Sequence, residues 1–286
     1  MPTVQTPPIL ATIHSIPITS TRVSDTRFLK DPKFTNWIHK LASNFSVNSV
    51  NVTDVYWFGP NLGFVNCQVD AVDSDGDKIP GLALVRGDCC AVLIILDCEG
   101  VQYAVNVTES RVPVAGMHTQ AVAGMLDGAG TPGGRIVNKV LDEVREETGL
   151  DTSTCDIINM SEGIQKLAAT KGLAVSQYWK SSAGTTDEGI INFAIRIPIT
   201  MTELCKLEGR VIRNSAENEK CLVSYVPLDY FGMIADSKNK ALMNDYNMLM
   251  KENMFPKSWY PSPWYMSDKS ILMGIGIFIF AISYFM

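Results

Sequence analysis

The sequence predicts an α/β fold, and three observations support this. Residues 55–107 consist of short apolar runs separated by turn residues, a pattern typical of successive strands. Residues 30–45, 136–148 and 241–250 carry apolar side chains at helical spacing. Residues 271–286 contain no charged side chain. Strands mixed with a few helices indicate an α/β sandwich, to which the last run adds an apolar C-terminal helix.

The composition limits the class of protein. Hydrophobic residues make up 46% of the 286 residues and charged residues 19%, so the bulk of the chain is not disordered. Lys and Arg total 24 against 30 Asp and Glu, which gives a net charge of −6. Because a protein that neutralises many phosphates needs a cationic surface, a general nucleic-acid-binding protein is excluded.

Cysteine and histidine are not arranged as metal ligands. The seven cysteines include no Cys-x-x-Cys pair, which argues against a zinc ribbon. The three histidines are scattered along the chain. A metal ion would therefore have to be held by carboxylates.

The N-terminal third predicts one helix followed by strands. Asp31-Pro32 is a start signal for the helix over residues 30–45. The run at 90–96 is apolar throughout, as in a strand that is buried on both faces. The strands are expected at residues 55–58, 63–69, 81–85, 90–96 and 101–107.

The C-terminal half predicts further helices and strands. An apolar stripe predicts a helix over residues 136–148, which Gly149 ends. Strands are expected at 190–197 and 221–226, and a closing helix at 241–250.

The last residues predict a membrane anchor. As a helix, residues 271–286 would extend about 24 Å, close to the shortest length that crosses a bilayer. Trp259, Tyr260, Trp264 and Tyr265, just before this run, suit a membrane interface. We therefore expect a transmembrane tail anchor, with the bulk of the protein in the cytosol or an organelle matrix. The alternative is a C-terminal helix that docks in a soluble core or against a partner protein.

The N-terminus gives little information on targeting. Residues 1–21 lack the charged start and the compact apolar core of a secretory signal. A mitochondrial presequence is a weaker alternative, which makes the mitochondrion one candidate for the organelle.

A helical cluster of acids is the strongest chemical signal. Glu143, Glu146 and Glu147 fall within about 100° of one face of the helix predicted at 136–148. Three like charges repel one another unless a cation joins them, and hard oxygen ligands suit Mg²⁺ or Mn²⁺ bound together with substrate phosphates. The alternative is a solvated acidic helix end, although carboxylates there oppose the helix dipole.

The same segment resembles a known family. Glu143-x-x-Glu146-Glu147-x-Gly149-Leu150 is similar to the second half of the Nudix box, and the likeness extends to the plant-type ADP-sugar pyrophosphatases of the Nudix hydrolase family. It covers residues 28–253, with its parts in the family's order. The resemblance implies a Nudix-type α/β/α sandwich with a mixed sheet and an N-terminal β extension.

The box is degenerate in this chain. Gly134 stands where the family has its first Glu, and Asp142 stands where it has an Arg that orients the acids. Asp142 adds an anion where the resemblance leads us to expect a cation.

The resemblance also implies site residues. Glu143, Glu146 and Glu147, with the carbonyl of Ala123, would hold Mg²⁺ or Mn²⁺, and Glu147 is also counted as catalytic. Glu188 would be the general base that acts on the attacking water.

Two arginines complete the predicted site. The planar fork of Arg111 would bind the diphosphate of the substrate. Arg86 is a weaker candidate for the same role.

The resemblance implies cleavage of an ADP-sugar, such as ADP-glucose or ADP-ribose, to AMP and a sugar phosphate, by a homodimer formed through residues 28–70. The rival hypothesis is a catalytically inactive Nudix-fold subunit of a membrane-bound protein complex. We divide the chain into an N-terminal extension (1–27), a helix and strands for dimerisation (28–70), a Nudix domain (71–255), a Pro/Trp-rich linker (256–269) and a tail anchor (270–286).

Overall fold

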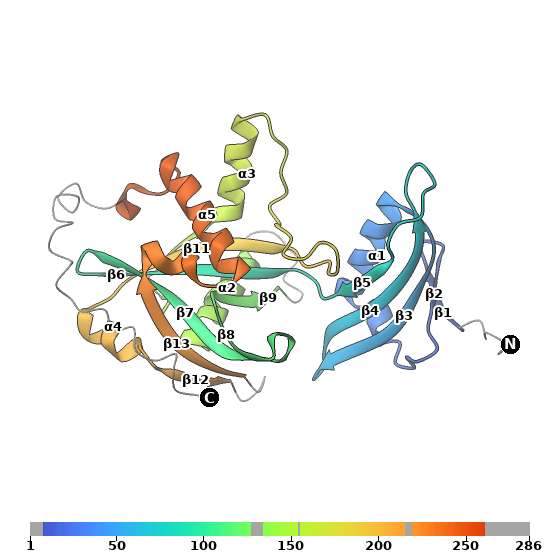
Figure 1. Cartoon of the computed structure of the whole chain (residues 1–286), viewed down its shortest axis with the longest axis horizontal. Helices are drawn as coiled ribbons and strands as arrows, with labels where there is room; N and C mark the ends of the chain where they lie inside the picture. Colours follow the sequence, from blue (N-terminus) through green and yellow to red (C-terminus); the bar gives the residue numbers. More distant parts are fainter. Residues whose placement is uncertain (1–7, 127–133, 154, 215–218, 261–286) are drawn as a thin grey trace.

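The described part of the chain contains two sheets, which lie side by side in the computed structural model (Figure 1). The structure describes residues 8–126, 134–153, 155–214 and 219–260. The first sheet has five strands in the order β1-β2-β3-β4-β5. Its strands are β1 (Ile9–Ile13), β2 (Ile16–Thr19), β3 (Ser46–Phe58), β4 (Asn61–Val72) and β5 (Leu82–Val85).

Helix α1 (Pro32–Asn44) packs against the first sheet, close to the range that the sequence predicts. Asp31 caps it by accepting a hydrogen bond from the Lys33 amide, and Pro32 occupies the first turn, where its missing N–H costs nothing. The buried face carries Phe34, whose ring meets Phe28 edge-on at a centroid distance of 5.0 Å. Phe28 belongs to the short helix η1 (Arg27–Lys30).

The second sheet has eight strands and a mixed pattern. Six form the path β10-β11-β6-β7-β13-β12, while β8 pairs with β7 and β9 pairs with β6. The β11–β6 pair is parallel and the other pairs are antiparallel. The strands are β6 (Cys89–Cys98), β7 (Val101–Arg111), β8 (Gly116–Gln120), β9 (Val122–Met125), β10 (Asp156–Asn159), β11 (Ile190–Pro198), β12 (Val211–Asn214) and β13 (Glu219–Pro227).

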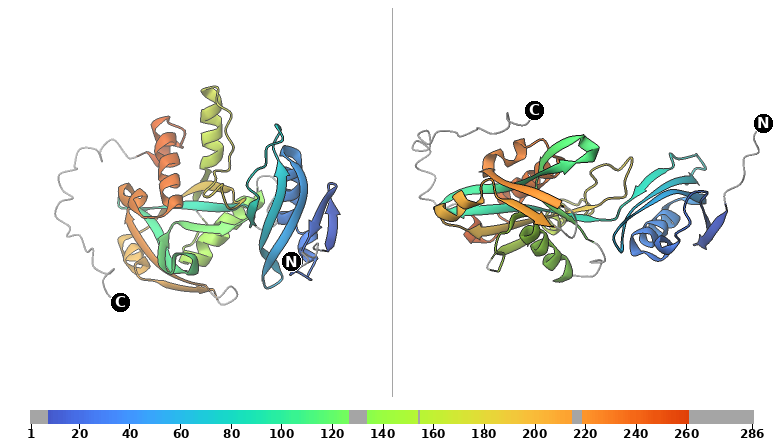
Figure 2. Two further views of the ribbon diagram at one scale, coloured as in Figure 1. Left: turned by 45° about the vertical axis from the view of Figure 1, so that its right-hand side comes forward. Right: turned by 90° about the horizontal axis from the view of Figure 1, so that it is seen from below.

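Strand β6 separates two apolar cores, as its continuous apolar run predicts. Cys90, Val92 and Ile94 face one core, and Cys89, Ala91 and Leu93 face the other, because successive side chains point to opposite faces. The first core receives α2 (Gly134–Thr148) and α4 (Met201–Leu207). The second receives α3 (Met160–Thr170), η3 (Leu228–Met233) and α5 (Ser237–Lys251), and Figures 1 and 2 show α3 and α5 on the same side of the sheet.

One chain segment changes partners between β7 and β6. Its first half is β8, which pairs with β7, and its second half is β9, which pairs with β6. At the change, the amide of Ala121 donates to Oδ1 of Asn239 at 2.7 Å. The Asn239 amide in turn donates to Asp236, the N-cap of α5, so the start of α5 fixes this corner.

The transmembrane helix in the predicted fold class is not found, and that part of the prediction is corrected. No helix within the described ranges is both long and apolar enough to cross a membrane. Helices α2 and α5 have 15 residues each, about 22 Å, and both have a polar face. Residues 270–286, assigned to the anchor, lie outside the described residues, as do residues 261–269 of the linker.

The described part of the linker is packed against the protein. Trp259, which the sequence assigned to a membrane interface, is 1% exposed and stacks on Phe255 at 5.0 Å. It lies in η4 (Lys257–Trp259) and belongs to the core beside α5. The chain passes from the first sheet to the second at residues 86–88, between β5 and β6. The predicted division of the chain into domains at residue 70 stays a prediction.

Candidate functional site

The acid pair of α2 lies at the edge of the first core. Val140 and Val144 anchor the helix in that core and are fully buried. Glu143 and Glu147 stand one turn apart on the neighbouring face, and both are buried, at 9% and 7% exposed. Burial of two carboxylates on one helix turn is costly unless something compensates their charge.

Strand β9 approaches this pair so closely that only glycine fits. A Cβ atom built on Gly124 would lie 1.9 Å from Cδ of Glu143. The carbonyl of Gly124 accepts a contact from the Cys90 thiol at 3.5 Å, which ties β9 to β6 at this point. Ala123, the residue predicted to supply a main-chain ligand, precedes Gly124 and stands opposite Ala91.

The charge of Glu147 is poorly compensated. Oε2 of Glu147 is buried and has no hydrogen-bond partner among the described residues. Burial, and then the negative charges of Glu143, Glu109 and Glu219, raise the pKa of Glu147 well above its ordinary value, and Arg111 opposes the shift. Glu143 is paired with Lys139, whose Nζ lies 2.7 Å from Oε1.

The third acid of the predicted face lies apart from the other two. Glu146 is exposed, and its role as a metal ligand stays a prediction. Asp142 is turned outward as well and pairs with Arg145 at 2.6 Å, each side chain being about half exposed. Asp142 therefore does not take part in the buried pair of Glu143 and Glu147.

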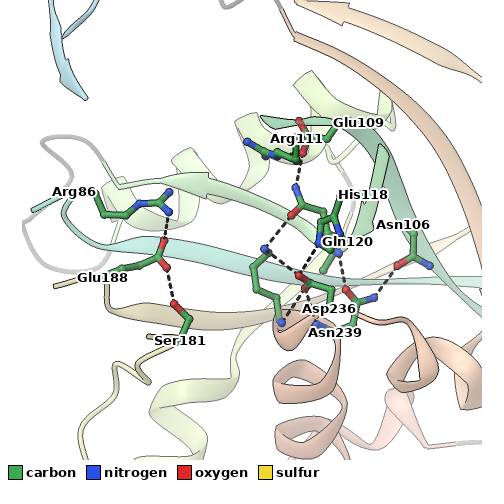
Figure 3. A network of polar contacts seen from close by, with 12 residues as sticks. Arg86, Asn106, Glu109, Arg111, His118, Gln120, Ser181, Glu188, Asp236 and Asn239 are labelled. Carbon is green, nitrogen blue, oxygen red and sulfur yellow. Dashed lines mark hydrogen bonds and ion pairs between the residues drawn. The ribbon is translucent and has the colours of Figure 1, made fainter. Parts of the chain in front are cut away.

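Glu109 and Gln120, which the sequence did not single out as site residues, form a hydrogen-bonded group with Arg111. Glu109 is 6% exposed and its Oε1 lies 2.5 Å from Nη2 of Arg111. The same oxygen accepts a short hydrogen bond from Nε2 of Gln120 on β8 (Figure 3). The signal was present in the sequence, because residues 109 and 111 are two apart on a strand and so share a face.

The predicted base lies in a second group of polar residues. Oε1 of Glu188 is 3.1 Å from Nη1 of Arg86, and Oε2 accepts from the Ser181 hydroxyl at 2.8 Å. Nε of Arg86 is buried without a partner among the described residues, and Nη2 meets only the Met125 sulfur at 3.3 Å. Arg86 is therefore incompletely satisfied as a hydrogen-bond donor.

The structure places Glu188 and the acid pair on opposite faces of β6. Arg86, the ion-pair partner of Glu188, contacts Met125 of β9, whereas the preceding residue, Gly124, lies against Glu143. Successive residues of a strand point to opposite faces, so the two groups of acids do not meet in this conformation. Figure 3 shows Arg86, Glu188 and Ser181 as one group and the contacts around Glu109 as another.

The acid pair fits a divalent cation in part. Within the described ranges, no three Asp, Glu, His or Cys side chains are arranged to hold a metal ion. The unpartnered oxygen of Glu147 and the close approach of β9 to Glu143 nevertheless suit a cation. Mg²⁺ is commonly bound by one or two carboxylates, with water and substrate phosphates as the other ligands.

Comparison with known proteins supports the resemblance. No protein-family model matches the chain. It is 27% identical over 231 residues to Nudix hydrolase 14, chloroplastic, of Arabidopsis thaliana, which covers 77% of this chain and 72% of the relative. This similarity confirms the predicted resemblance to Nudix hydrolases.

Two solved structures are also similar. The structure of an ADP compounds hydrolase has 12% identity and a TM-score of 0.47, covering 73% of this chain and 96% of the other. The binary complex of an Ap4A hydrolase from C. elegans has 11% identity and a TM-score of 0.36, covering 58% and 98%.

Proposed function

We propose that this protein hydrolyses the diphosphate bond of an ADP-sugar, such as ADP-glucose or ADP-ribose, and releases AMP and a sugar phosphate. The observation that carries this is the buried pair Glu143 and Glu147, packed against Gly124 with one carboxylate oxygen unpartnered. The similarity to an Arabidopsis Nudix hydrolase supports the hydrolase class.

Glu143 and Glu147, with the main chain of Ala123, would hold Mg²⁺ or Mn²⁺. When bound, such a cation neutralises charge on the diphosphate and polarises a water molecule. Its presence would also offset the burial and the repulsion that raise the pKa of Glu147. Lys139, now 2.7 Å from Glu143, would move aside or share that carboxylate.

Arg111 binds the diphosphate in this proposal. One arm of its guanidinium contacts Glu109, its side chain is 42% exposed, and its positive charge acts on Glu147. A planar guanidinium with free N–H groups suits bidentate contacts with phosphate oxygens. Arg86, with its unpartnered Nε, is the second candidate for such a contact.

Glu188 takes the proton of the attacking water as oxygen–phosphorus bond formation expels the leaving phosphate. Its carboxylate must first leave Arg86 and Ser181, which engage both of its oxygens, and must then reach the face of β6 that carries the acid pair. A diphosphate that binds Arg86 would compete with Glu188 for the guanidinium and so favour this release.

The test is AMP release from ADP-glucose and ADP-ribose by the full-length protein with Mg²⁺ or Mn²⁺. Glu143→Gln and Glu147→Gln should each lower kcat at least about 100-fold, because each removes a charged ligand of the cation. Glu162→Gln is the matched control, since Glu162 is exposed on α3 and pairs with Lys166 at 2.7 Å. Absence of AMP release with every sugar and metal tried would refute the proposal.

One observation favours a second function, a catalytically inactive subunit of a protein complex. The ammonium group of Lys139 already pairs with Glu143, so a side chain of the protein neutralises one of the two acids in place of a metal ion. If the protein is such a subunit, both the wild type and Lys139→Met should be inactive. If it is an enzyme, Lys139→Met should alter the Mg²⁺ concentration needed for half-maximal rate.

We also infer a homodimer formed through residues 28–70. Tyr56 and Phe58 of β3 are 47% and 59% exposed, and exposed aromatic side chains are enriched at protein interfaces. Size-exclusion chromatography with light scattering should give twice the mass of the chain. A single-chain mass at every concentration would contradict the dimer.

The name of the Arabidopsis relative assigns it to the chloroplast. For this chain we propose the matrix of an organelle, with the mitochondrion as an alternative compartment. Fractionation of organelles followed by immunodetection tests this, and recovery only in the cytosolic fraction would contradict it.

A further inference from the structure

A line of polar side chains connects the start of α5 with Arg111. Lys238 donates from Nζ to Oε1 of Gln120 at 2.9 Å, and Gln120 donates from Nε2 to Oε1 of Glu109. The same Glu109 oxygen accepts from Nη2 of Arg111 at 2.5 Å. Figure 3 shows that these contacts join β7, β8 and the N-terminal turn of α5.

The direction of each hydrogen bond is determined by its two ends. A lysine ammonium can only donate, and an ionised carboxylate can only accept. Gln120 therefore has a single orientation that satisfies both neighbours, with its oxygen toward Lys238 and its amide toward Glu109. Loss of the lysine would leave the Gln120 oxygen without its donor and allow the amide to rotate.

Burial makes the two middle members of this line depend on their partners. Gln120 is 4% exposed and Glu109 6% exposed, so water has little access to either side chain. Lys238 is itself fixed at the N-terminus of α5, where its amide donates to Asp236 at 2.8 Å and its Nζ lies 3.5 Å from the same carboxylate. His118 contacts Asp236 from β8 at 3.1 Å and closes the other side.

We infer that Glu109 and Lys238 are positioning residues for Arg111. Glu109 holds one arm of the guanidinium beside the acid pair, and Lys238 holds Glu109 through Gln120. The remaining N–H groups of Arg111 then point away from Glu109 with restricted freedom, and the entropy lost on binding a phosphate group is reduced. This inference rests on the proposed function, because it assigns the orientation of Arg111 to diphosphate binding.

The test uses the full-length protein and three variants of α5. Lys238→Met removes the donor but keeps most of the stem, and Lys238→Arg restores a cationic donor. Lys240→Met is the matched control, because Lys240 is exposed two residues further along the helix. For Lys238→Met we expect KM for ADP-ribose to rise about fivefold to tenfold with kcat within twofold of wild type, since ground-state and transition-state contacts with the diphosphate weaken together.

A second readout does not require activity. In ¹⁵N-detected NMR, assigned with Arg111→Lys, the Arg111 guanidinium should show slow rotation and separate Nη signals in the wild type. The separate signals should be lost in Lys238→Met, kept in Lys240→Met and recovered in Lys238→Arg. Glu109→Gln, which keeps an acceptor but removes the charge, should give the same loss and serves if Lys238→Met does not fold.

The outcomes separate the two proposals. If the wild type releases no AMP, the proposed function fails, and the NMR signals alone decide whether Lys238 and Glu109 position Arg111. Unchanged Arg111 signals in both Lys238→Met and Glu109→Gln would overturn the inference whatever the activity. A fall in kcat with unchanged KM would also overturn it, because orientation for binding would then not be what Lys238 supplies.

Discussion

Gly124 on β9 lies against the carboxylate of Glu143 on α2, and this contact sets how close the helix and the strand can come. Cγ and Oε1 of Glu143 would lie 2.4 and 2.0 Å from a Cβ atom at Gly124. The contact joins the strand that carries Ala123 to the helix that carries the acid pair, the two elements to which the cation ligands are assigned. The position of the Glu143 carboxylate therefore depends on a residue without a side chain.

The first prediction follows from that contact. Gly124→Ala should displace Glu143 or push β9 away, and it should destabilise the protein by about 1–3 kcal/mol, the usual cost of overpacking. Urea denaturation measures the free energy of unfolding. Gly116→Ala is the control, because the atom nearest to a Cβ there is 4.0 Å away. Equal stability of the two variants would show that β9 and α2 can relax around Glu143.

Asp142 provides the second prediction. It lies on the outer side of α2 with Arg145, and exposed ion pairs at this spacing contribute little, about 0.3–0.5 kcal/mol. Asp142→Asn should therefore change the free energy of unfolding by less than about 0.5 kcal/mol and leave kcat/KM for the ADP-sugar within twofold. A loss of activity as large as that expected for Glu147→Gln would mean that Asp142 acts together with Glu143 and Glu147, and it would contradict the outward position of Asp142.

The third prediction concerns the pH dependence of stability. The pKa of Glu147 is raised in the folded protein, so between its ordinary value and the raised value the folded state binds more protons than the unfolded state. The contribution of Glu147 to stability is therefore greatest below about pH 4.5 and decreases as the pH rises through this window.

Glu147→Gln removes the group whose titration lowers the free energy of unfolding as the pH rises. At pH 7 and without divalent metal, the variant should be more stable than the wild type by about 1–3 kcal/mol, the range for a buried polar group without a partner. The advantage should shrink as the pH falls toward 4. Urea denaturation between pH 4 and pH 8 measures it, with Glu162→Gln as the control. A variant less stable than the wild type at neutral pH would mean that Glu147 has a compensating partner.

Much of this fold could be predicted from local patterns, and the site only in part. The apolar run at 90–96 correctly indicates a strand buried on both faces, and the acids of α2 are correctly placed on a helix. Helical spacing alone cannot tell that Glu146 is exposed while Glu143 and Glu147 are buried, because this depends on which side of α2 packs against the sheet.

Contacts between residues far apart in the chain could not be predicted from the sequence for a different reason. Gln120 meets Lys238, and Arg86 meets Glu188, across about 100 residues of chain. No local pattern determines such pairs, since they arise from the order of strands in the sheet. The position of Glu188 on the far side of β6 from the acid pair could not be predicted for the same reason.

The last prediction tests metal binding without activity. If Glu143 and Glu147 hold Mg²⁺ in the folded state alone, then Mg²⁺ at 100 times its Kd should stabilise the wild type by about 2.7 kcal/mol. Because the cation also offsets the repulsion between the two acids, the wild type should approach or exceed the stability of Glu147→Gln once metal is present. Differential scanning fluorimetry with MgCl₂, and with NaCl of equal ionic strength, measures the shift in Tm.

Glu143→Gln and Glu147→Gln should lose most of the shift and Glu162→Gln should keep it. A shift of the same size in all four proteins would mean that Mg²⁺ acts elsewhere, and the acid pair of α2 would then not be its site.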